Sequence, residues 1–106
     1  MDHPIFHCVF DIKLGKNQMQ VPNFRTGEYS QNNGVTWEYH DGEACREVHF
    51  KAIFDDKRRM MVMICHNTDN GDGWEREGES EYYFHEFSEK KAYPLGINIV
   101  FYAMTH

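Results

Sequence analysis

The sequence predicts one α/β domain, in which a β-hairpin is followed by helices. Apolar and polar residues alternate over 47–54, and a nearly continuous apolar run follows over 59–65. This pair of patterns is typical of two strands joined by a tight turn. After residue 80 the spacing of apolar residues becomes helical, and the chain ends in a run with almost no polar face. At 106 residues the chain has room for one domain with one core.

The first 42 residues are expected to hold little regular structure. Residues 4–12 alternate loosely, which predicts an extended segment that ends in a turn at 14–16. Residues 17–42 are polar and rich in glycine and asparagine, with an Asn-Gly turn signal within 31–34 and a candidate strand over 35–39. We therefore expect a surface segment dominated by loops.

The hairpin over about 47–65 is the clearest unit. Its first strand is expected to point Val48, Phe50, Ala52 and Phe54 inward, and residues 55–58 form the turn. The second strand is apolar on both faces, which is typical of a central strand covered on both sides. Residues 60–64 are therefore expected to be buried.

Two helices are expected after the hairpin. Ser80 has the chemistry of an N-cap, and the aromatic residues after it predict a short helix over about 81–87. The apolar run predicts a buried C-terminal helix over about 94–105, with Pro94 in its first turn, where a missing N–H costs nothing. A single kinked helix that starts at Ser88 is the alternative.

The charge balance argues against two classes of partner. The chain has 11 basic and 17 acidic residues, a formal net charge of −6, and its basic triplet at 57–59 falls on the expected hairpin turn. Nucleic acids and anionic membrane surfaces are therefore not expected partners. No window approaches the roughly 18 consecutive apolar residues of a membrane span, and the first residues lack a signal-peptide pattern. We expect a soluble chain that does not insert into a membrane.

The cysteines and histidines show no recognisable ligand spacing. The chain has three cysteines, Cys8, Cys45 and Cys65, an odd number that is too small for a disulfide framework. None of them belongs to a C-x-x-C pair. Reduced, mostly structural thiols are expected. The histidines are scattered without the spacing of structural zinc sites. We therefore expect no metal site and no cofactor.

The segment after the second strand is the strongest candidate site. The apolar run ends there in a loop, expected over 66–75, that contains two glycines. It also contains five residues whose side chains can contact a ligand: His66, Asp69, Asp72, Trp74 and Glu75. In α/β proteins, sites lie where buried strands end in polar loops. We predict these five residues as ligand-binding residues.

Each of these residues also has a structural interpretation. His66 could act as a general base, or its imidazole could hydrogen-bond the backbone of the loop. Asp69, Asp72 and Glu75 suit hard cations, but the EF-hand pattern fails and Asx turns explain the same composition. Trp74 could line a ligand groove or an interface, or it could pack in the core.

Four segments of the chain together resemble a known family. They are Asp2-His3-Pro4-Ile5, Ile53-Phe54-Asp55-Asp56, residues 65–75 and residues 87–98. They resemble the C-terminal part of the bacterial family catalogued as domain of unknown function 4159, most specifically over 47–106. The resemblance implies a flavodoxin-like sandwich of the class I glutamine amidotransferase-like type, with trehalose-utilisation-type proteins as cousins. It brings no established biochemical activity.

The same resemblance implies that the 106 residues are the C-terminal part of a larger family domain, an α+β remnant of that sandwich. In amidotransferase-like enzymes the nucleophilic cysteine lies on a strand-to-helix elbow in the N-terminal half. No cysteine of this chain has the flanking glycines of such an elbow. His66, however, leaves its strand where the catalytic histidine of such relatives follows its own.

Two functions are compatible with these observations. The first is a non-catalytic domain that binds a small ligand or a partner protein, or assembles, through residues 66–75. The second is part of an amidotransferase-like hydrolase or transferase, with His66 as general base and the nucleophile on another segment or chain. The missing elbow favours the first. A central-type strand and an all-apolar helix in so short a chain also predict self-association or binding to another protein chain.

Overall fold

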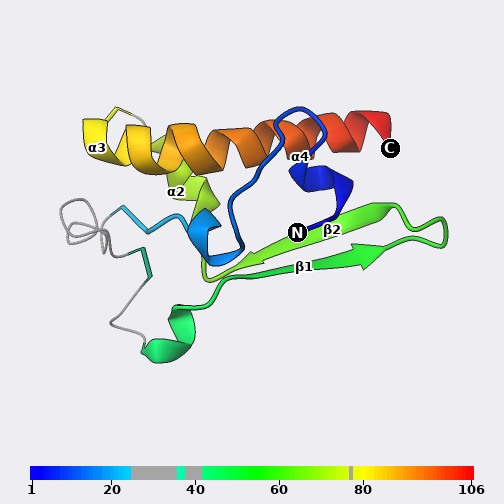
Figure 1. Cartoon of the computed structure of the whole chain (residues 1–106), viewed down its shortest axis with the longest axis horizontal. Coiled ribbons are helices and arrows are strands. Elements are labelled where there is room, and N and C mark those ends of the chain that lie inside the picture. The colour runs from blue at the N-terminus through cyan, green and yellow to red at the C-terminus, as the bar shows by residue number, and fades with distance from the viewer. Residues whose placement is uncertain (25–35, 38–41, 77) are drawn as a thin grey trace.

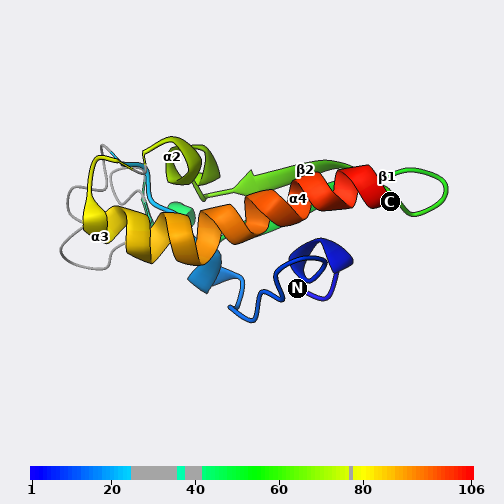
Figure 2. The same cartoon turned by 90° about the horizontal axis from the view of Figure 1, so that it is seen from above.

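The computed structural model describes residues 1–24, 36–37, 42–76 and 78–106. A long helix forms one layer and a β-hairpin the other, and the N-terminal segment packs against both (Figures 1 and 2). Within the described residues before the hairpin, three short 3-10 helices form: η1 (Pro4–Phe6), η2 (Asn17–Met19) and η5 (Glu43–Cys45). The fold is thus a mixed α/β arrangement. Among the described residues, no helix is long and apolar enough to span a membrane.

The predicted hairpin is confirmed. Strands β1 (His49–Phe54) and β2 (Met60–His66) pair antiparallel, with an irregularity in the register between Ile53 and Phe54. The Asp55 carboxylate closes the turn, because its Oδ1 accepts hydrogen bonds from the backbone N–H groups of Lys57 at 2.9 Å and Arg59 at 2.8 Å. Arg58 takes the left-handed conformation, with φ of 62°.

The prediction that β2 is a buried central strand is wrong for this chain. The described sheet has two strands, so only one of its faces packs against the rest of the molecule. Met61, Val62 and Ile64 are exposed, Met61 by 59%. Phe54, expected to point inward, is also exposed, because it lies at the register irregularity near the end of the hairpin. The partly buried inner positions of the sheet are Phe50, Met60, Met63 and Cys65.

The helices after the hairpin form one continuous helix. Ser80 is its N-cap, as predicted, and its Oγ accepts from the Tyr83 N–H at 3.2 Å. The helix runs through α3 (Glu81–Tyr83), the π-helical segment η6 (Phe84–Ala92) and α4 (Tyr93–Thr105). The expected break before Pro94 is absent. A proline inside a helix lacks an N–H and crowds the preceding turn, and the wider π turns immediately before Pro94 accommodate it.

The N-terminal segment is pinned to this helix rather than extended. Residues 4–6 form η1, where His3 Nδ1 accepts from the Ile5 N–H at 3.1 Å, so the predicted extended conformation is wrong there. The buried Asn98 side chain accepts from the N–H groups of Val9 at 3.1 Å and Phe10 at 2.8 Å. The main core cluster therefore joins this segment to α4, through Ile5, Phe6, Ile12, Met19, Leu95 and Tyr102.

The C-terminal helix is buried on one face only, which corrects the prediction of a fully buried helix. Leu95, Asn98 and Tyr102 face the core. On the opposite face Val100 is 59% exposed and Met104 is 80% exposed. The predicted turn within 31–34 and most of the candidate strand 35–39 lie outside the described residues.

Candidate functional site

The segment after β2 is a short capped helix and not a loop. After Asn67, which has a φ of 63°, the chain enters α2 (Asn70–Glu75). Asp69 is the N-cap, and its Oδ1 accepts from the Asp72 N–H at 3.0 Å. The Asn67 amide donates to the carbonyl oxygens of Ala44 at 3.0 Å and Glu47 at 2.8 Å. An Asp or Asn residue three positions before an acidic residue is typical of a helix start. The two glycines of the segment favour a loop instead, so the sequence did not predict this helix.

Gly73 is required for close packing rather than for a turn. A Cβ at this position would lie 2.5 Å from Ala92 Cβ and 3.1 Å from Val21 Cγ1. The Gly73 carbonyl also accepts a 2.6 Å hydrogen bond from the buried Ser88 hydroxyl. The second glycine of α2, Gly71, has more room, with Asp69 Oδ1 3.6 Å from the corresponding position. Gly73 therefore lets α2 lie directly on the long helix.

The two aspartates that were predicted to bind a ligand, Asp69 and Asp72, instead contact the protein's own backbone and side chains. Asp69 Oδ2 accepts from the Asn23 amide at 2.9 Å, and Asp72 Oδ2 accepts from the Phe24 N–H at 2.8 Å. Asp72 Oδ1 also lies 4.0 Å from Arg76 Nε. Both carboxylates thus hold residues 23–24 against α2. Among the residues that the structure describes, no three His, Cys, Asp or Glu side chains are arranged to hold a metal ion.

His66 lies apart from these aspartates. It is exposed at the end of β2, where its ring faces that of His49 at a centroid distance of 5.7 Å. The backbone of the loop is held by residues other than His66: the Gln20 amide donates to the Asn67 carbonyl at 2.8 Å, and the Val21 carbonyl accepts from the Asp69 N–H at 2.8 Å. Glu75 is on the surface, 3.8 Å from Arg76 Nε. The five predicted ligand-binding residues are therefore neighbours in sequence that point into different surroundings.

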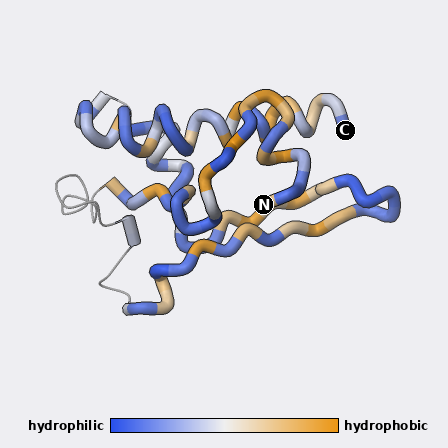
Figure 3. The backbone as a smooth tube through the Cα atoms, in the orientation of Figure 1, coloured by the Kyte–Doolittle hydropathy of each residue, from blue (hydrophilic) through white to orange (hydrophobic). Residues whose placement is uncertain are grey.

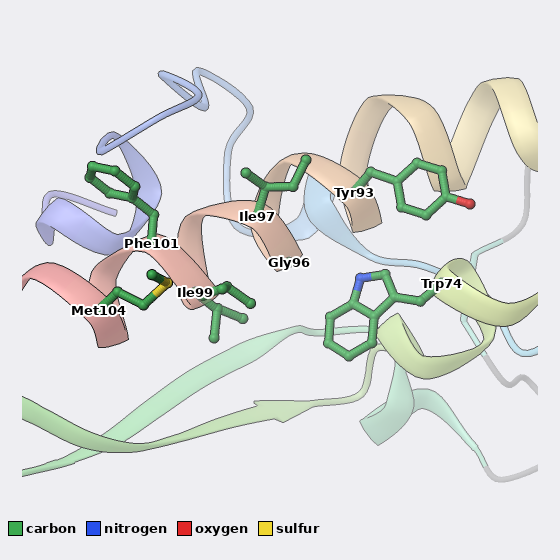
Figure 4. Close-up of a pocket in the computed structure, with 8 residues that line it drawn as sticks. Trp74, Tyr93, Gly96, Ile97, Ile99, Phe101 and Met104 are labelled. Carbon is green, nitrogen blue, oxygen red and sulfur yellow. The ribbon is translucent and has the colours of Figure 1, made fainter.

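Of the five predicted ligand-binding residues, Trp74 is the one that lines a groove. Its indole N–H donates to the Ala92 carbonyl at 2.6 Å, and its ring packs on Gly96, where a Cβ would come within 2.9 Å of the indole nitrogen. The indole forms one wall of an apolar groove of about 660 Å³ along α4 (Figure 4). The other lining residues are Tyr93, Gly96, Ile97, Ile99, Val100, Phe101 and Met104.

Sequence reasoning missed these α4 residues as a site. The near absence of polar residues over 94–105 predicts, from the sequence alone, burial inside the domain and not a groove. Positions 93, 97, 100 and 104 are separated by four, three and four residues, which places them on one stripe of a helix. That spacing was the available signal.

The three thiols lie in partly enclosed surroundings. Cys8, Cys45 and Cys65 are free and partly buried. Burial raises the pKa of the Cys65 thiol, which lowers its thiolate fraction at neutral pH. The Cys8 thiol donates to the Asn98 carbonyl at 3.3 Å. Neither environment is that of an activated nucleophile.

Comparisons with known proteins place the chain in a family. No curated protein and no solved structure matches it. One family model matches residues 1–104, which is nearly the whole length. The chain belongs to the family described as a domain of unknown function (DUF4159).

Proposed function

We propose that this chain is a non-catalytic assembly domain that pairs with a second copy of itself through α4. The contact surface is the outer stripe, defined as Tyr93, Ile97, Val100 and Met104, with Phe101 beside it. The observation that carries the proposal is that this stripe is apolar and uncharged, yet it faces away from the core. Figure 3 shows the change along the long helix, from a hydrophilic beginning to a hydrophobic end.

The spacing of the stripe suits a second helix. Apolar residues four, three and four positions apart form the kind of seam along which two helices pack. No residue of α4 is charged. A helix that is apolar around its whole circumference is normally buried on all sides. In a single chain the core covers one side of α4, and a partner helix would cover the other.

A second copy is a partner that the outer stripe can accept despite the charge of the chain. Each chain has a formal net charge of −6, so two copies repel each other, and a contact surface without charged residues adds no further repulsion. The outer stripe provides such a surface. A twofold pairing of the stripe with itself requires no complementary charges, because the same apolar patch is presented by both partners.

The size of the surface predicts a weak dimer. The stripe, Phe101 and Trp74 are each only partly exposed, so the contact surface is limited to one face of one helix and an indole ring. Stable specific interfaces bury about 800 Å² per partner, and smaller ones are transient. We therefore expect a dimer that forms reversibly with concentration.

A non-catalytic role is supported by the surroundings of the candidate catalytic groups. The carboxylates of Asp69 and Asp72 are occupied by Asn23 and the Phe24 N–H. The Cys65 thiol is partly buried, with a raised pKa. These groups are used to hold the fold together.

The second candidate function is part of an amidotransferase-like enzyme within a flavodoxin-like sandwich. It is favoured by the outer face of the hairpin, where Ile53, Val62 and Ile64 are exposed as they would be if further layers covered them. His66 lies at the end of that face, accessible to a nucleophile from another segment. This candidate predicts amide hydrolysis by the native polypeptide that His66→Ala abolishes. An unchanged rate in the variant would contradict it.

Two matched substitutions test the assembly proposal. Val100 on the outer stripe and Met61 on the hairpin are both 59% exposed in the single chain. In sedimentation velocity over a concentration series, Val100→Glu should give a monomer, and Met61→Glu should associate like the unmodified chain. Loss of association in Met61→Glu alone would place the contact on the hairpin and overturn the proposal. A monomeric unmodified chain at high concentration would also overturn it.

A further inference from the structure

The two histidines on the outer face of the hairpin form a pair that sequence spacing does not reveal. His49 in β1 is directly opposite His66 in β2. Directly opposite residues of an antiparallel pair project from the same face of the sheet. Their ring centroids are 5.7 Å apart, with the planes inclined by 30°. The pair lies at the end of the hairpin from which the chain continues to α2 (Figure 1).

This pair differs from the other described histidines, each of which has at least one ring nitrogen in a hydrogen bond. His3 accepts from the Ile5 N–H, His7 bonds Asp11, and His85 bonds Glu89. His106 lies 2.9 Å from the Thr105 hydroxyl. Neither His49 nor His66 is hydrogen-bonded to another residue that the structure describes. Two neighbouring imidazoles thus keep nitrogens free for a ligand.

We propose that His49 and His66 together bind a divalent transition-metal ion of the zinc class. Neutral imidazole is a ligand for such ions, with a metal–nitrogen distance of about 2.0–2.1 Å for zinc. Two imidazoles on one tetrahedral ion have their ring centres roughly 5 Å apart. The observed separation of 5.7 Å is slightly larger, so a shared ion requires the two side chains to rotate toward each other.

The remaining coordination positions are filled by water. No third His, Cys, Asp or Glu of the described residues completes the set. The charged groups that flank His49 along the chain are Glu47, which lies before β1 and whose carboxylate is 2.9 Å from Lys16 Nζ, and Lys51 within β1. Magnesium and calcium prefer oxygen ligands, so they should not bind here. The site is therefore open and selective for metals that accept nitrogen.

A bound ion would connect β1 to β2 next to the start of α2. A ligand that binds the folded chain and not the unfolded chain raises the apparent stability in proportion to its occupancy. Zinc should therefore raise the melting temperature of the chain. This site does not involve α4, so the proposal stands or falls independently of the assembly proposal.

The test is a zinc titration of the reduced protein by calorimetry, with a matched set of single substitutions. The unmodified chain should bind one ion that magnesium does not displace. His49→Gln and His66→Gln should each weaken that binding by about tenfold or more. His85→Gln removes an exposed histidine from the long helix and should leave the affinity unchanged.

A spectroscopic measurement on the unmodified chain locates the ion independently of the variants. Zinc should shift the imidazole nitrogen resonances of His49 and His66 and leave those of His85 in place. Equal zinc affinity in the unmodified chain and in both hairpin variants would overturn the proposal. Zinc-dependent shifts at His3 and His106, or at the thiols, with none at His49 and His66 would overturn it as well.

Discussion

Individual polar residues after β2 hold the fold together, and they do so through short, directed contacts. Asp69 caps α2 and binds Asn23, and Asn67 bridges two carbonyl groups of the segment before β1. Gly73 provides the space in which α2 meets the long helix. Capping and packing thus give Asp69, Asn67 and Gly73 structural roles.

The two glycines of α2 provide a matched test of this packing. Gly73→Ala should destabilise the chain by about 1–3 kcal/mol, because the new methyl group would overlap Ala92. Gly71→Ala should be neutral or stabilising by up to about 1 kcal/mol, because alanine favours a helix over glycine. Urea unfolding of both variants measures the difference. Equal stability of the two would contradict the close approach at Gly73.

Asp69 and His66 are expected to differ in how much they contribute to stability, because Asp69 caps a helix and His66 is an exposed side chain. Asp69→Ala removes the N-cap and should lower the free energy of unfolding by about 1 kcal/mol. His66→Ala should change it by less than about 0.5 kcal/mol without added metal, because the side chain is exposed. Thermal melts in the presence of a chelator measure both. A larger loss in His66→Ala than in Asp69→Ala would reverse these assignments.

Lys91 makes the stability of the chain depend on pH. Burial lowers its pKa from 10.5 to about 8, although its ammonium group donates to the Gln20 carbonyl at 3.1 Å. Between about pH 8 and pH 10.5 the unfolded chain therefore binds more protons at this site than the folded chain, and stability contributed by Lys91 rises with pH. Below pH 8 both states are protonated and the dependence disappears. In Lys91→Met this rise should be absent, as urea unfolding at several pH values would show; parallel profiles for both proteins would contradict it.

At the scale of elements, local sequence patterns predicted those features that depend only on residues close together in the sequence. The hairpin, its turn at 55–58 and the Ser80 N-cap are confirmed, because alternation and capping act over a few residues. Burial was predicted less well. The apolarity of β2 and α4 predicts burial, yet both elements have an exposed apolar face in the single chain, and a sequence pattern does not say whether a covering surface belongs to the same chain.

The continuous helix and α2 have different physical causes. Pro94 predicts a helix start, because proline lacks a backbone N–H. The helix nevertheless continues through Pro94, because the wider π-helical turns before it accommodate the proline ring and packing against the N-terminal segment stabilises the helix. In α2 the glycines suggested a loop, and contacts with Val21 and Ala92, distant in sequence, make a helix favourable instead. The groove at Trp74 depends on this placement of α2, which explains why the sequence did not predict it.

At the scale of the whole molecule, the chain is a thin two-layer structure with exposed apolar residues on both layers. It measures 43 × 28 × 21 Å, and its radius of gyration of 14.0 Å exceeds the roughly 13 Å typical of a compact chain of this length. Large exposed apolar surfaces on soluble domains mark interaction sites. Of the two layers, the helical one presents the seam spacing and the groove.

The net charge gives the predicted association a characteristic salt dependence. Two chains of charge −6 repel each other, and salt screens this repulsion while leaving the apolar contact intact. The association constant should therefore rise between about 0.05 M and about 0.5 M salt. Light scattering at fixed protein concentration measures this. A fall in association with salt would indicate an interface held by ion pairs and would contradict an apolar seam.

The central claim is that the outer stripe of α4 contacts the same stripe of a second copy. Isotope-filtered NMR on a mixture of labelled and unlabelled chains tests it most directly, because it detects contacts between copies alone. The assembly proposal predicts intermolecular contacts among the methyl groups of Ile97, Val100 and Met104. Intermolecular contacts from Val62 and Ile64 of the hairpin, with none from α4, would contradict it.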